Sequence, residues 1–262
     1  MLFRSLKVSG APGQCIRIRY AERLDADGSL YTENLRNARA TDTYTIGDSG
    51  EGVYEPHFTF HGFQYVELEG IADPPPGDAI TGVALYTDMP ETGNMTTSDD
   101  RVNRLIGNIL WGQKGNHLDI PTDCPQRDER LGWTGDAWAF VRTAAMNMDI
   151  GPMYRKWFRD LTDSQSANGV VRMYAPDPLA STHDDGRDGG PAWADAVVFC
   201  PWAVYRAYGD RRVLEQHFDA MKRFVDWIET TSTDGIRCGM GYAGWLGFGD
   251  WLAPGAPAPD QT

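Results

Sequence analysis

The sequence is most unusual at Asp119-Ile-Pro-Thr-Asp-Cys-Pro-Gln-Arg-Asp-Glu-Arg-Leu-Gly-Trp-Thr-Gly-Asp136. Five carboxylates, two arginines, two prolines and a tryptophan fall within these eighteen residues. An amphipathic helix needs a repeating apolar stripe, and a plain turn favours Gly, Asn or Pro, so neither explains the mixture. Acids, guanidinium groups and an indole are the side chains that hold a polyhydroxylated ring and protonate one of its oxygens. The alternative is a solvated loop crossed by salt bridges, because runs of charge usually lie on wet surface.

This stretch offers the acids that cleavage of a glycosidic bond requires. The reaction needs a proton donor at the leaving oxygen and a second carboxylate that activates water or attacks the sugar. Crowded carboxylates raise one another's pKa, whereas Arg127 and Arg130 lower the pKa of a neighbouring acid. The sequence alone therefore leaves open which acid stays protonated. The candidates are Asp123, Asp128, Glu129 and Asp136.

The first part of the chain carries a β pattern. Over residues 14–20, three apolar side chains alternate with two arginines, which is the period of a half-buried strand. Residues 58–68 and 80–87 are further strand candidates, because they are rich in aromatic and β-branched side chains. We expect a sandwich of short antiparallel strands here.

From about residue 97 the apolar spacing becomes helical. All nine tryptophans also lie in this second part, at or after Trp111. The pattern predicts two domains, a β-sandwich over 1–96 and a set of helix pairs arranged around a centre over 97–262. Five helices are predicted: one after an N-cap at Thr97 or Ser98, one from Ala137, one from Pro152 to about Asn168, one over 193–208 with a kink or break at Pro201, and one from Asp210 onward.

Composition excludes several classes of protein. The chain has 262 residues and a formal net charge of -13, which argues against a nucleic-acid partner. No apolar run reaches about 18 residues, so we expect no span of a membrane. The first residues are too few and too charged for a secretory signal, which favours a cytoplasmic location, although they resemble the interior of a β-region in a longer protein.

We expect neither a metal nor a cofactor. The four cysteines are far apart, and the sequence contains no GxSxG, Walker or dinucleotide-binding motif. His117 is the histidine nearest to the acidic stretch, and a packing role suits it better than metal binding. Cys124 has no evident histidine partner, so we interpret it as a packing residue rather than a nucleophile.

The sixteen residues from Pro121 to Asp136 closely resemble a motif of the bacterial α-L-rhamnosidases of glycoside hydrolase family 78. Segments elsewhere agree: 111–116, 193–195, 208–210 and 249–252 resemble the catalytic domain, and 33–36 and 55–67 resemble the β-sandwich module that precedes it. The resemblance covers nearly the whole chain. It implies an (α/α)6 barrel that hydrolyses terminal α-L-rhamnose from rhamnosides with inversion.

The resemblance also assigns roles to individual residues. It implies that Glu129 is the general acid. It places the residues that grip rhamnose at Asp123, Arg127, Trp133 and Asp136, and aromatic walls of the pocket at Trp193 and Trp251. The alternatives are helix capping for the two aspartates and core packing for the tryptophans. Two positions depart from the family pattern, Gln64 and Trp138.

In this family the general base is a glutamate far downstream, so we expect it beyond Thr262 and expect this chain to be a fragment with about half of the barrel. Two other hypotheses stay open. One is a non-catalytic sugar-binding remnant that lacks the base, and the other is a different (α/α)6 glycosidase or lyase. The oligomeric state and the group attached to rhamnose are not indicated by the sequence.

Overall fold

A computed structural model of the chain describes residues 2–178, 188–237 and 248–249. Its internal contacts divide the chain into two compact units. The first comprises residues 1–88 and 95–130, and the second comprises residues 89–94 and 131–262.

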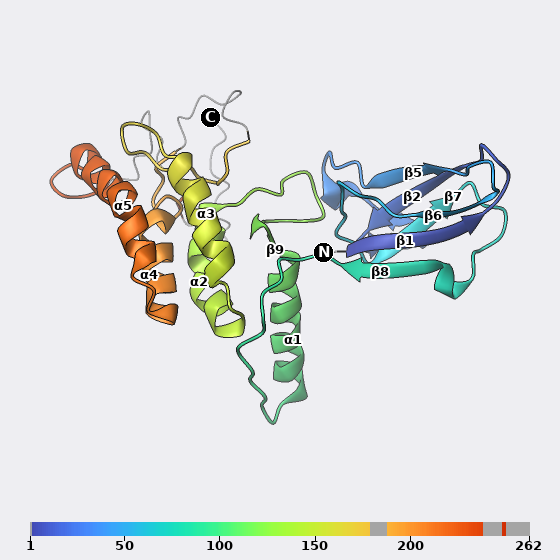
Figure 1. Cartoon of the computed structure of the whole chain (residues 1–262), viewed down its shortest axis with the longest axis horizontal. Coiled ribbons are helices and arrows are strands. Elements are labelled where there is room, and N and C mark those ends of the chain that lie inside the picture. The colour runs from blue at the N-terminus through green and yellow to red at the C-terminus, as the bar shows by residue number, and fades with distance from the viewer. Residues whose placement is uncertain (1, 179–187, 238–247, 250–262) are drawn as a thin grey trace. The chain divides into compact units, whose positions relative to one another are not determined.

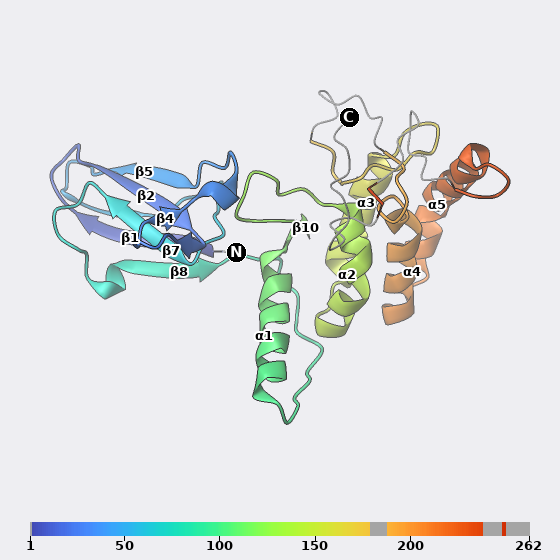
Figure 2. The same ribbon diagram turned by 180° about the vertical axis from the view of Figure 1, so that it is seen from behind.

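The first unit contains two three-stranded antiparallel sheets (Figures 1 and 2). One has the order β6-β1-β8 and the other the order β5-β2-β7. Side chains from both sheets meet in a common core of Leu6, Ile16, Ile18, Tyr20 and Ile46, which confirms the predicted sandwich. The strands are β1 (Leu2–Ser9), β2 (Cys15–Ala21), β5 (Thr41–Thr45), β6 (Glu51–Tyr54), β7 (Tyr65–Glu69) and β8 (Ile80–Ala84).

The alternation at residues 14–20 correctly predicted β2, whose isoleucines are buried while Arg17 is exposed. The strand expected over 58–68 is only half present, because β7 begins at Tyr65. Ahead of it, His61 turns inward, stacks on Tyr20 at a centroid distance of 4.1 Å and bonds Asp42 at 3.1 Å. The strand expected over 80–87 stops at Ala84 because Thr87 instead donates its N–H to the carbonyl of His117.

Short elements connect the sheets to the rest of the first unit. β3 (Arg23–Leu24) pairs with β4 (Leu30–Tyr31), and two 3-10 turns lie at η1 (Glu33–Leu35) and η2 (Gly77–Ala79). Helix α1 (Asp100–Gly115) is followed by the hairpin of β9 (His117–Leu118) and β10 (Ile120–Pro121). The N-cap of α1 is Asp99, which accepts a hydrogen bond from the N–H of Arg101, so the predicted cap at Thr97 or Ser98 was wrong.

In its described residues, the second unit contains four helices, α2 (Thr134–Asn147), α3 (Gly151–Asp163), α4 (Ala196–Tyr208) and α5 (Arg212–Thr231). Helix α2 packs on α4, α4 on α5, and α3 on both α4 and α5 (Figure 1). Three fully buried aromatic side chains on α3 form the centre of this core: Tyr154, Trp157 and Phe158. None of the helices that the structure describes is long and apolar enough to cross a membrane.

The helix boundaries differ from the prediction at several points. Helix α2 begins at Thr134, before Ala137, and α5 begins at Arg212 rather than at Asp210. Helix α3 ends at Asp163, because the polar residues that follow bond the backbone instead, as when the Ser164 hydroxyl donates to the carbonyl of Asp160.

Helix α4 also departs from its predicted form. It begins at Ala196 rather than at residue 193, because residues 190–195 form turns in which Asp195 accepts the N–H of Ala192 at 2.8 Å. Pro201 neither breaks nor ends the helix; it is buried inside it.

Candidate active site

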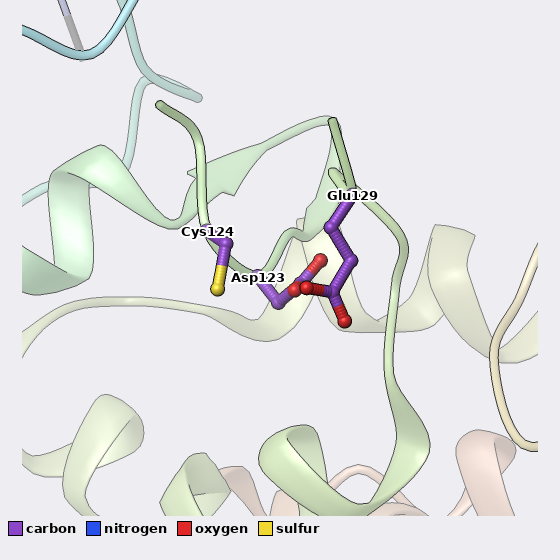
Figure 3. Close-up of side chains that lie close together, drawn as sticks. All are labelled: Asp123, Cys124 and Glu129. Atoms are coloured by element: carbon purple, nitrogen blue, oxygen red, sulfur yellow. The ribbon is translucent and has the colours of Figure 1, made fainter. Parts of the chain in front are cut away.

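The loop after β10 brings three of the predicted site residues together in the first unit. Asp123 is only 9% exposed, and its carboxylate lies beside that of Glu129 (Figure 3). The loop is irregular because Cys124 and Arg130 both take positive φ angles, 31° and 60°, and the N–H of Arg127 donates to the carbonyl of Cys124 at 3.3 Å. The backbone of this loop turns tightly, so the carboxylates of Asp123 and Glu129 lie close together.

Glu129 is held through one of its two oxygens. Its Oε2 accepts from Arg127 Nε at 2.9 Å, lies 2.6 Å from Arg127 Nη2, and accepts from Arg36 Nη1 at 3.3 Å. Across the described part of the chain, no hydrogen bond reaches Oε1. Burial opposes the charge of Arg127, but the bonds to Glu129 prevail and raise the pKa of Arg127 above its usual value. Glu129 is therefore anchored through one oxygen, which limits rotation of its carboxylate.

Glu129 also faces open space. It lines a hollow of about 270 Å³ whose wall includes Arg39, Thr59 and His61 from the sandwich loops and Asp128 from the acidic loop. Glu129 keeps 19% of its side-chain surface exposed. A ligand atom can therefore approach this side chain from solvent.

The other two candidate acids are both exposed and lie in different units. Asp128 is exposed and accepts the backbone N–H of Asn37 at 3.1 Å. Asp136 belongs to the second unit, on the first turn of α2, where it is also exposed. Asp123 does not precede a helix, so the capping alternative does not apply to it.

In the described structure, no hydrogen bond or ion pair joins Glu129 to Arg130 or His117. The guanidinium of Arg130 packs over the ring of Phe60, 4.4 Å from its centroid. Burial lowers the pKa of His117 to about 4, and its Nδ1 bonds the carbonyl of Gln113 at 2.9 Å. His117 is therefore neutral and buried at neutral pH.

Cys124 lies next to the two acids, and its thiol is protonated. Burial, a hydrogen bond with Asp123 and the charge of Asp123 raise the pKa of Cys124 to about 12. The donor atoms of Asp123, Cys124 and Glu129 lie within 4.8 Å of one another, which is close enough to surround a cation. A thiol must lose its proton to bind a metal, and a bound cation itself promotes that loss.

The state of Cys124 can be tested by alkylation. At pH 8 a thiol with a pKa of about 12 is less than about 0.1% thiolate, so we expect Cys124 to react with iodoacetamide at least about tenfold more slowly than the exposed Cys15. Peptide mass spectrometry after timed labelling would measure both rates in one sample. Unfolding in urea is the control, because both sites should then react alike. Equal rates in the folded protein would contradict the protonated thiol.

In the second unit, aromatic side chains gather around two of the predicted tryptophans. Trp133 lies edge-on to Tyr174 at a centroid distance of 5.2 Å, and Phe248 lies 4.7 Å from Trp193 and 6.1 Å from Trp133. A Cβ added at Gly135 would lie 2.7 Å from the indole of Trp193, so only glycine leaves room for this ring. Trp251 lies outside the described residues.

The backbone around Trp133 is tied to residues 173–175. Gly132 accepts the N–H of Ala175 at 3.0 Å, and Thr134 donates both its N–H and its hydroxyl to the carbonyl of Met173. Asp188 is 7% exposed and binds the same segment at Met173, because it accepts from Arg172 and from the N–H of Met173. Trp133 therefore sits on a backbone that is fixed on both sides.

Sequence reasoning did not assign roles to Arg36, Tyr174 or Phe248. Arg36 is separated from Glu129 by 93 positions, and no local pattern signals such a contact. Tyr174 and Phe248 stand in loops, where spacing carries no information about which side chains meet. The segment at residues 33–36 is distinguished only by its resemblance to the family's sandwich module.

Comparisons with known proteins identify the family of the chain. The family profile of the bacterial alpha-L-rhamnosidase 6 hairpin glycosidase domain matches residues 90–262, and that of the bacterial alpha-L-rhamnosidase concanavalin-like domain matches residues 2–86. An alpha-L-rhamnosidase from Streptomyces avermitilis is 44% identical over 245 residues, which cover 94% of this chain and 23% of that protein. One from Formosa agariphila is 41% identical and covers 92% of this chain and 26% of its own length.

Solved structures give the same result. The S. avermitilis alpha-L-rhamnosidase complexed with L-rhamnose has a TM-score of 0.88 at 43% identity, covering 96% of this chain and 24% of that one. The alpha-L-rhamnosidase from Dictyoglumus thermophilum has a TM-score of 0.89 at 38% identity, covering 98% and 28%. The chain thus spans about a quarter of the length of these relatives. An antiparallel β domain followed by part of a six-hairpin helical domain is the predicted order, and it is confirmed. The chain therefore belongs to the bacterial α-L-rhamnosidase family, glycoside hydrolase family 78.

Proposed function

We propose that the natural protein containing this chain hydrolyses terminal α-L-rhamnose from rhamnosides with inversion, and that Glu129 is its general acid. The arrangement of Glu129 carries the proposal. Arginines occupy Oε2, while the side chain also lines an open hollow. An acid held in this way can present a proton on Oε1 to the glycosidic oxygen.

The proposed reaction follows from two carboxylates. As the bond from C1 to the leaving oxygen breaks, the proton passes from Glu129 to that oxygen. Water attacks C1 from the opposite face and gives its proton to the second carboxylate. The family resemblance implies that this base is a glutamate downstream of Thr262.

The remaining residues of the proposed site bind the sugar. Asp123 is buried beside Glu129, so its carboxylate suits a hydroxyl next to the reacting carbon. Trp133 and Trp193 offer indole faces for the C–H side of the ring. Arg127, Asp136 and Trp251 complete the set that we propose. We also propose that the boundary between the sandwich module and the barrel lies near residue 96.

An activity assay tests the proposal. We expect the natural full-length protein to release p-nitrophenol from p-nitrophenyl α-L-rhamnoside, and proton NMR of the first turnovers to detect the β-anomer of rhamnose. We expect the 262-residue chain, assayed beside it, to be inactive, because it spans only about a quarter of the length of the relatives that it matches. Lack of activity in both proteins would favour a sugar-binding remnant, and an α-anomer as first product would refute inversion.

A further inference from the structure

We propose that Arg36 of the β-sandwich is a positioning residue for the general acid, so that the sandwich takes part in catalysis. This inference rests on the proposed role of Glu129. Arg36 Nη1 donates to Glu129 Oε2 at 3.3 Å, on the same oxygen that Arg127 binds. Both residues belong to the first unit, although 93 positions separate them in the chain.

The backbone at Arg36 is held in a conformation that side-chain-bearing residues rarely adopt. Its φ is 55° and its ψ is -121°. It directly follows η1, where its N–H donates to the carbonyl of Glu33 at 3.2 Å and Leu35 is buried. Such strain persists only where the surrounding structure enforces it, and it is found most often at functional sites. Here the strained residue is the one that reaches Glu129.

Neighbouring contacts fix the acidic loop against the sandwich. The N–H of Asn37 donates to Asp128, so consecutive sandwich residues hold consecutive acids. A Cβ added at Gly62 would lie 2.9 Å from the Cβ of Gln126, so these two segments are in close contact. The loop therefore has little freedom to move away from Arg36.

The geometry indicates what Arg36 contributes. Its side chain is 53% exposed, and an ion pair at such a site adds little stability. Two guanidinium groups on one oxygen, however, restrict rotation of the carboxyl group and leave Oε1 as the proton-bearing oxygen. We therefore expect Arg36 to affect proton transfer more strongly than folding or sugar binding.

The test is Arg36→Gln in the natural full-length protein, assayed on two substrates. Methyl α-L-rhamnoside has a poor leaving group that needs a proton, whereas 2,4-dinitrophenyl α-L-rhamnoside has a good one that does not. We expect kcat on the methyl glycoside to fall about 10- to 100-fold, with kcat on the dinitrophenyl glycoside and both KM values within about threefold of wild type. Arg36→Lys should recover part of the loss.

Arg39→Gln is the matched control. Arg39 is exposed and lines the hollow beside Glu129. Its replacement by glutamine removes the same charge, but no hydrogen bond or ion pair joins Arg39 to Glu129 in the described structure. We expect this variant to keep the wild-type ratio of the two activities. An equal loss on both substrates in Arg36→Gln, no loss at all, or the same ratio change in Arg39→Gln would overturn the proposal.

Glu129→Gln in the same assay separates this inference from the proposed function. If Glu129→Gln loses the methyl activity and Arg36→Gln does not, Glu129 is the acid and Arg36 does not position it. If Glu129→Gln loses neither, the proposed function fails first. Thermal unfolding of each variant shows whether it is folded, and Arg36→Gln melting well below wild type would assign Arg36 a structural role instead.

Discussion

Glu129→Gln in the natural full-length protein is expected to lower kcat on methyl α-L-rhamnoside by about 10²- to 10⁴-fold. The amide keeps the size of the side chain and a carbonyl oxygen for Arg127 and Arg36, but it has no proton to give to the leaving oxygen. On 2,4-dinitrophenyl α-L-rhamnoside the loss should be far smaller, because that leaving group departs without a proton. Steady-state kinetics on both substrates would measure the difference.

Asp128→Asn is the control for this experiment. Asp128 is the adjacent acid, but it bonds the backbone of Asn37, and an amide oxygen can accept the same hydrogen bond. We expect its two activities to stay within about threefold of wild type. Wild-type turnover of the methyl glycoside by Glu129→Gln would refute its role as general acid.

The largest loss of stability is expected at Trp157. This side chain is fully buried on α3, and its Nε1 donates to the carbonyl of Ala175 at 2.9 Å. Removing the indole creates a cavity, so we expect Trp157→Ala to reduce the free energy of unfolding by about 3–5 kcal/mol. Urea-induced unfolding would measure the change.

Two further variants identify the cause of that loss. Trp157→Phe keeps most of the buried ring but leaves the carbonyl of Ala175 without its donor, so we expect a loss of about 1–3 kcal/mol. Trp138→Ala removes a 38% exposed tryptophan and should change stability by less than Trp157→Phe does. A loss at Trp138 as large as that at Trp157 would contradict a core centred on α3.

The sequence predicted those elements whose burial follows a simple period. Strand β2 is buried on one face only, so apolar and polar residues alternate in its sequence. The order of the β domain and the helices could be predicted from the change in the spacing of apolar residues. The prediction was wrong where tertiary contacts override local pattern. His61 lies in an apolar stretch of sequence but bonds Asp42 instead of continuing a strand. Residues 190–195 form turns before α4 begins. The spacing of apolar residues in the sequence predicts neither of these two features.

The candidate site was predicted to a similar extent. The family motif implied the roles of Asp123, Arg127 and Glu129, and the structure brings these three together on one loop. Sequence reasoning treated Arg127 and Arg130 alike as neighbours of the acids, yet only Arg127 bonds Glu129 while Arg130 packs on Phe60. Which of two nearby arginines reaches an acid depends on backbone direction, and Arg130 has a positive φ angle that sequence does not reveal.

The paired contacts at Arg36 and Asn37 bear on how this enzyme family can be recombined. The contact from Asn37 comes from its backbone, so any residue except proline at that position preserves it. The contact from Arg36 comes from its side chain, so it depends on which residue stands at that position. A chimera that joins a foreign sandwich to this acidic loop would therefore keep the backbone contact to Asp128. If Arg36 positions the acid as proposed, the chimera would still turn over poorly unless the grafted module supplies a cationic side chain at that position.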